Sequence, residues 1–182
     1  MTKILLLGLG RWGANHLRNL HNLPVELYVA EVGDKQLEPA RKIGLPAERL
    51  TTNYRDFLDT VDAAVVVTPA QTHFRLCKEF LEAGKDVFVE KPLTLSNEES
   101  KQLAELADKH KRVLQVGHIL RFDPATLWLR DAIEKGVISE AFVAEEIRQK
   151  HIRHDSLELV AKCRIREHSH PYLSREVEHH GC

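Results

Sequence analysis

Short apolar runs alternate with amphipathic stretches through the first two-thirds of the chain. Residues 4–7 and 61–67 are aliphatic or β-branched with almost no polar interruption, a pattern that is typical of parallel strands buried on both faces. Both segments are therefore predicted strands. Further strands are predicted over residues 25–30, 86–90 and 113–116.

Helices are predicted between these strands. The first has Ala14, Leu17 and Leu20 on its apolar face and ends before Pro24, where the helical pattern stops. The last is introduced by Ser96, which forms a capping box with the acidic residue three positions later. The alternation predicts an α/β fold whose parallel sheet has helices on both faces. Two more helices are predicted over residues 39–43 and 73–83.

A glycine-rich turn, G-L-G-R-W-G over residues 8–13, joins the first predicted strand to the first helix. Gly8 permits the tight bend, Gly10 lets the backbone approach a pyrophosphate, and Gly13 lets the helix pack closely on the strand. Exposed N–H groups and the helix dipole then bind the anion without a charged side chain. The sheet is thus predicted to be of Rossmann type. The cofactor-binding residues expected in this turn are Gly8, Gly10, Arg11, Trp12 and Gly13.

An acidic residue, Glu31, stands about 20 residues after the glycine turn, at the end of the second predicted strand. Its carboxylate can accept both hydrogens of a ribose diol and would repel a 2'-phosphate, so NAD is predicted as the cofactor in preference to NADP. Two other interpretations stay open. Glu31 could be a solvated residue at a strand end, and Arg41 or Lys42 could reach a 2'-phosphate.

Length and charge narrow the classes of function. The chain has 182 residues and a formal net charge of -1, which allows one domain and part of a second and provides no field that attracts nucleic acid or anionic membranes. No uncharged apolar stretch approaches the roughly 20 residues that span a bilayer. Three widely spaced cysteines suit free thiols in a reducing compartment. We expect a cytoplasmic protein with a small-molecule substrate and with no nucleic-acid or membrane partner.

Three further motifs follow the glycine turn in order. They are Thr68-Pro69-Ala70-Gln71-Thr72-His73, Val89-Glu90-Lys91-Pro92, and Gly117-His118 with Arg121-Phe122 and Pro124. Together with the glycine turn, they resemble the glucose-fructose oxidoreductase and inositol dehydrogenase family, also called Gfo/Idh/MocA. The similarity extends over residues 1–147.

This resemblance implies an NAD(P)-dependent oxidoreductase. The reaction would transfer a hydride between the nicotinamide and a hydroxyl-bearing carbon of a sugar, a polyol or a similar small molecule. Lys91 would be the catalytic residue, because an ammonium group beside the nicotinamide can hydrogen-bond the substrate oxygen. His118 and Arg121 are the candidate substrate contacts. The residues that the resemblance adds to the cofactor site are Thr68, Pro69, His73, Glu90 and Lys91 itself.

Structural roles stay open for several of these residues. Lys91 could be a surface lysine at a strand end, His73 could cap or pack at the sheet edge, and Arg121 could be a surface ion-pair partner. Their position favours a site, since open α/β sheets bind ligands at the carboxyl ends of their strands.

The regular alternation ends near residue 117. A helix over 124–135 and a strand over 141–147 are expected beyond it, as an incomplete α+β remnant, and residues 151–182 hold six of the eleven histidines without a helical or strand period. The parent reading frame is expected to be lost or truncated near this point. The predicted domains are a dinucleotide-binding domain over 1–120, the start of the family's C-terminal domain over 121–150, and an atypical His-rich tail over 151–182.

The tail contains Cys and His residues that can bind metals, but their spacings do not match a standard zinc site. No metal is predicted. The missing substrate half also leaves an alternative function open, namely a nucleotide-binding module without turnover. Family analogy allows a homo-oligomer.

Overall fold

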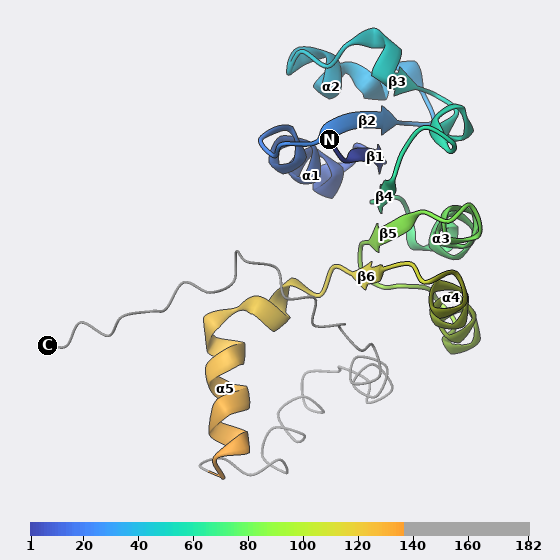
Figure 1. Cartoon of the computed structure of the whole chain (residues 1–182). Helices are drawn as coiled ribbons and strands as arrows, with labels where there is room; N and C mark the ends of the chain where they lie inside the picture. The colour runs from blue at the N-terminus through green and yellow to red at the C-terminus, as the bar shows by residue number, and fades with distance from the viewer. Residues whose placement is uncertain (137–182) are drawn as a thin grey trace, which may run out of the picture. The chain divides into compact units, whose positions relative to one another are not determined.

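In the described part of the chain, residues 1–136 of a computed structural model, six parallel strands form one sheet in the order β3-β2-β1-β4-β5-β6 (Figure 1). The central strand, β1, pairs with β2 on one side and with β4 on the other. This arrangement confirms the predicted Rossmann-type sheet. The strands are β1 (Lys3–Leu7), β2 (Glu26–Ala30), β3 (Leu50–Thr51), β4 (Ala63–Val66), β5 (Asp86–Val89) and β6 (Leu114–Val116).

Successive residues of β1 point into two different cores. Leu5 and Leu7 belong to the core that contains Leu76 and Phe80 of α3 (His73–Glu82), whereas Leu6 belongs to the core that contains Leu17 of α1 (Arg11–His21). Because side chains alternate between the faces of a strand, a run that is apolar throughout is the sequence signature of a sheet covered on both sides. Figure 1 shows α1 on one face of the sheet and α3 and α4 (Asn97–His110) on the other.

The helices agree with the predicted pattern except in the face of the first one. Gly13 and Leu17 of α1 are buried, but Ala14 is exposed, so the prediction that Ala14 faces the core is wrong. The neighbouring Gly13, which has no side chain, lies against the carbonyl oxygen of Gly8 instead. The helices are α1 (Arg11–His21), α2 (Glu38–Lys42), α3 (His73–Glu82), α4 (Asn97–His110) and α5 (Pro124–Glu134).

The strand β3 was not predicted. Its two residues pair with Val29 and Ala30 at the edge of the sheet, and two residues are too few to give a hydrophobic pattern. By contrast, the start of α4 was predicted from local chemistry, since the Ser96 hydroxyl accepts a hydrogen bond from the N–H of Glu99 at 3.5 Å.

Residues 1–127 form one compact unit, and the other described residues, 128–136, belong to a second. Helix α5 lies where a helix was predicted. The predicted strand over 141–147 and the His-rich tail lie outside the described residues. Within residues 1–136, no helix has the length and apolar character needed to cross a membrane.

Candidate functional site

The carboxyl ends of five strands lie level along one edge of the sheet. Leu7 is paired with both Ala30 and Val66, and Val66 in turn is paired with Val89. Val89 is paired with Val116. The residues that follow these strand ends therefore emerge side by side, and they include the glycine turn, Glu31, Thr68, Glu90, Lys91 and Gly117.

The three glycines of the turn differ in what surrounds them. Gly8 has a φ of +93°, and a Cβ there would stand 2.5 Å from the carbonyl oxygen of Val67. A Cβ on Gly13 would overlap the carbonyl oxygen of Gly8. A Cβ on Gly10 would meet no atom within 4 Å. The protein's own backbone thus requires two of the glycines, whereas the space over Gly10 is open to a ligand.

Helix α1 begins at this turn without a side-chain cap. Its first-turn N–H groups are consequently available to an anion, and Gly10 and the side chains of Arg11 and Trp12 are exposed beside them. An open, uncapped helix start over a glycine fits the diphosphate of a dinucleotide.

Glu31 is fixed beside the glycine turn. One carboxylate oxygen accepts a hydrogen bond from the N–H of Leu9 at 2.5 Å, and the other accepts one from the N–H of Val32 at 2.9 Å. These two bonds hold the carboxylate between the first and second strand ends. They distinguish it from a solvated glutamate, which was one of the open interpretations.

Arg41 is already paired. Its guanidinium donates to the Asp34 carbonyl oxygen at 2.9 Å, to the Asp34 carboxylate, and to the Glu38 carboxylate at 3.1 Å. A 2'-phosphate would have to compete with two carboxylates for this side chain. The alternative in which Arg41 serves NADP is weakened accordingly.

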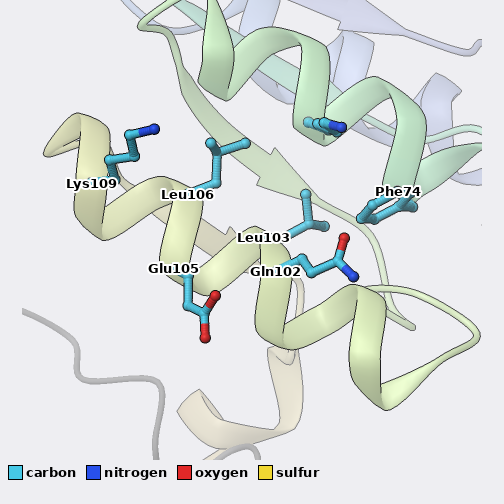
Figure 2. A pocket seen from close by; sticks show the side chains of 7 residues that line it. Phe74, Gln102, Leu103, Glu105, Leu106 and Lys109 are labelled. Atoms are coloured by element: carbon cyan, nitrogen blue, oxygen red, sulfur yellow. The ribbon is translucent and has the colours of Figure 1, made fainter.

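A hollow lies beside β3, at the edge of the sheet. Its first lining residue, Asp34, comes three positions after Glu31 in the sequence. The hollow has a volume of about 360 Å³ and is lined by Asp34, Leu37, Arg41 and residues of the segment after Pro46. A second hollow, of about 270 Å³, lies between α3 and α4 (Figure 2). Its lining comes from these two helices, including Phe74 of α3 and Leu103 of α4, and includes none of the residues that directly follow the strand ends.

Thr68 and His73 follow β4. The Thr68 hydroxyl lies 2.7 Å from the Thr72 hydroxyl, which in turn bonds to the carbonyl oxygen of Pro69. His73 is buried, with an exposed fraction of 1%. Its Nδ1 lies 2.8 Å from the carbonyl oxygen of Pro92, and its Nε2 lies 2.8 Å from that of Thr68. The ring therefore sits beneath the strand ends and joins two of them.

Lys91 is exposed at the end of β5. The peptide bond between Lys91 and Pro92 is cis. The preceding residue, Glu90, has one carboxylate oxygen 2.8 Å from Nε2 of His16, and the other accepts the Lys91 N–H at 3.2 Å. In residues 1–136, the Lys91 amine takes part in no hydrogen bond or ion pair, so it is available to a ligand.

Sequence reasoning did not identify His16. It lies three residues after Gly13 and thus one helical turn into α1, on the side that faces the sheet. That spacing was the available signal, but its partner Glu90 is 74 residues away in the sequence.

Gly117, His118 and Arg121 follow β6. A Cβ on Gly117 would lie 3.2 Å from a carboxylate oxygen of Glu90, so the glycine leaves room for that side chain. Burial lowers the pKa of His118, and the positive charge of Arg121 lowers it further. Both side chains are half-buried. In residues 1–136, no three His, Cys, Asp or Glu side chains are grouped to hold a metal ion.

Residues 2–118 match the family described as an oxidoreductase family with an NAD-binding Rossmann fold, the Gfo/Idh/MocA family. The chain belongs to this family. The matched range includes all six strands of the sheet. It confirms the resemblance inferred from the four motifs.

Among curated family members, the chain is 37% identical over 141 residues to the scyllo-inositol 2-dehydrogenase (NAD(+)) of Bacillus subtilis. That match covers 74% of this chain and 41% of the relative. It is 33% identical over 128 residues to the UDP-N-acetylglucosamine 3-dehydrogenase of Acidithiobacillus ferrooxidans, covering 70% of this chain and 40% of that protein.

Solved structures of family members show the same architecture. The scyllo-inositol dehydrogenase of Lactobacillus casei, with bound NAD(H) and scyllo-inositol, superposes with a TM-score of 0.68 at 26% identity. The match covers 76% of this chain and 42% of that one. The chain therefore spans about two-fifths of the length of the relatives it matches.

Proposed function

We propose that this family member is an NAD-dependent dehydrogenase that oxidises a hydroxyl-bearing carbon of a polyol, a sugar or a sugar derivative. The observation that carries the proposal is the level row of strand ends, which brings the glycine turn, Glu31 and Lys91 to one edge of the sheet. Ligands bind at this edge in open α/β sheets. Relatives named as dehydrogenases of scyllo-inositol and of UDP-N-acetylglucosamine support the substrate class.

In the proposed complex, the cofactor extends along this edge. Its diphosphate lies over Gly10 and the start of α1, and Glu31 accepts the hydroxyls of the adenosine ribose. The hollow beside Asp34 and Leu37 is then next to the adenosine. Thr68, Pro69 and Glu90 lie farther along the same row, toward the nicotinamide.

Lys91 is proposed as the catalytic residue. When bound, NAD accepts the hydride that leaves the substrate carbon. The Lys91 amine hydrogen-bonds the reacting hydroxyl and, in its neutral form, takes the hydroxyl proton as the C–O bond becomes a carbonyl. His118 and Arg121, which follow the next strand end, are the proposed substrate contacts.

Calorimetric titration with NAD and NADP and an assay of NADH formation test this function. The assay uses scyllo-inositol, myo-inositol and UDP-N-acetylglucosamine as substrates. We expect tighter binding of NAD than of NADP and NADH production with at least one substrate. We expect Lys91→Met to lower turnover at least about 100-fold, the size of a lost proton-transfer group, while NAD affinity changes less than about twofold.

Lys78→Met is the matched control, because Lys78 lies on the exposed side of α3. It should match the unmodified protein in both measurements. NAD binding without NADH production on any substrate would instead support the alternative, a nucleotide-binding module without turnover. If the folded protein binds no NAD, both functions are wrong.

A further inference from the structure

Two histidine side chains hold the chain on either side of Lys91. His16 comes from α1 and contacts Glu90, the residue before the lysine. His73 comes from α3 and contacts the carbonyl oxygen of Pro92, the residue after it. The proposed chemistry assigns a reacting role to neither ring.

The contact through His16 fixes the main chain in two steps. The ring packs on Phe88 of β5, with centroids 5.5 Å apart, and its Nε2 lies 2.8 Å from one oxygen of Glu90. The other oxygen accepts the N–H of Lys91. Gly117 borders the same carboxylate and leaves space for it. A change at His16 is therefore transmitted to the Lys91 backbone through a single side chain.

The contact through His73 joins two strand ends. A carbonyl oxygen can only accept a hydrogen bond, and a neutral imidazole has one N–H, so the ring donates to one of these two oxygens while its other nitrogen lies against the second. His73 is almost completely buried. Removing the ring would leave the carbonyl oxygens of Thr68 and Pro92 without this contact, at a cost in stability. The end of β4 is thus tied to the segment after Lys91.

We propose that His16 and His73 are positioning residues that fix the main chain before and after Lys91, so that its amine is presented to a substrate. The role of Lys91 itself rests on the proposed function. For His73, this replaces the expected direct contact with the cofactor, because its buried ring has both nitrogens engaged by main-chain oxygens. A fixed backbone reduces the loss of conformational entropy when the lysine engages its ligand.

The first test measures hydrogen exchange of the Lys91 amide in the full chain by NMR. His16→Leu should accelerate exchange about tenfold, since the Glu90 carboxylate loses its charge-assisted partner. His16→Gln, whose amide can still donate to Glu90, should restore at least half of the protection. His21→Leu, an exposed histidine on the same helix, is the control and should exchange as the unmodified protein does.

The second test compares the affinities of NADH and ADP-ribose, which differ in the nicotinamide half. His16→Leu and His73→Asn should each weaken NADH about five- to tenfold and leave ADP-ribose unchanged. Leu76→Ala removes a buried apolar side chain from α3 and keeps the His73 ring that contacts Pro92 and Thr68. It should lower stability and leave the ratio of the two affinities unchanged.

The two tests separate this inference from the proposed function. If the unmodified chain binds neither nucleotide, the function is wrong, and amide exchange alone decides whether Glu90 and His16 hold Lys91. Unchanged exchange in His16→Leu would overturn the proposal for that residue. An equal loss of NADH and ADP-ribose affinity in His73→Asn would show that His73 has only a role in packing.

Discussion

The three glycines of the turn have different functions, which the G-x-G-x-x-G spacing alone does not reveal. The spacing of the three predicted a phosphate site, yet only Gly10 has open space where a side chain would stand. Gly8 and Gly13 are required by contacts within the protein. Ligand binding and fold stability are therefore assigned to different residues within six positions of the chain.

Alanine substitution separates these two functions. Gly10→Ala should weaken NAD binding about tenfold or more, because its Cβ enters the space assigned to the diphosphate, and it should leave stability unchanged. Gly13→Ala should lower the free energy of unfolding by about 1–3 kcal/mol, because its Cβ overlaps the Gly8 carbonyl oxygen. Urea unfolding and calorimetry check both variants. Normal NAD affinity in Gly10→Ala would contradict the assignment of the diphosphate.

Candidate site residues could be identified from the sequence where a local motif marks them. Residues whose role depends on a contact with a distant part of the chain could not. Glu31 was identified from its place at the end of an apolar strand, about 20 residues after the glycine turn, whereas the role expected of Lys91 came from the resemblance to the family. The contact of His16 with Glu90 depends on how α1 packs against the end of β5. A single sequence has no periodic signal for a contact across 74 positions.

At the scale of elements, the buried strands and long helices were predicted to within a few residues. Their patterns extend over several positions and reflect burial on both faces of the sheet. The exceptions are the short strand β3 and the exposed Ala14 of α1. Both the pairing of β3 and the exposure of Ala14 depend on tertiary packing, which the conformational preferences of single residues do not determine.

The end of β6 should respond to pH through His118. Because burial and Arg121 lower its pKa in the folded protein, the unfolded chain binds the proton more readily. The stability that the neutral ring provides is present above about pH 6.5 and is lost as pH falls below that value. Between about pH 7 and about pH 5, His118→Gln should therefore lose less stability than the unmodified protein.

Urea unfolding at both pH values measures this difference. His21→Gln changes an exposed histidine and should retain the full pH dependence. Equal losses in His118→Gln and in the unmodified protein would show that the ring does not contribute.

At the scale of the whole molecule, one sheet contributes side chains to two hydrophobic cores, one on each of its faces. Cys77 of α3 is fully buried in one of these cores, and burial raises the pKa of its thiol to about 12. The thiolate needed for alkylation is therefore absent at neutral pH. Reaction at Cys77 should require unfolding of the compact unit.

Pulse alkylation tests this expectation. We expect the peptide that contains Cys77 to remain unlabelled in buffer and to become labelled over the same range of urea concentration in which circular dichroism reports unfolding. Mass spectrometry of that peptide separates it from the other two cysteines, Cys163 and Cys182. Rapid labelling in buffer would indicate local opening of α3.

The strand order has a consequence for synthesis of the protein. β1 leaves the ribosome first and can pair with β2 after thirty residues, but its other edge is not covered until β4 is complete at Val66. Until then a nascent chain presents an apolar strand with free main-chain groups, the kind of edge that recruits other chains. The strand that leads into the glycine turn is thus also a strand that needs shielding during translation.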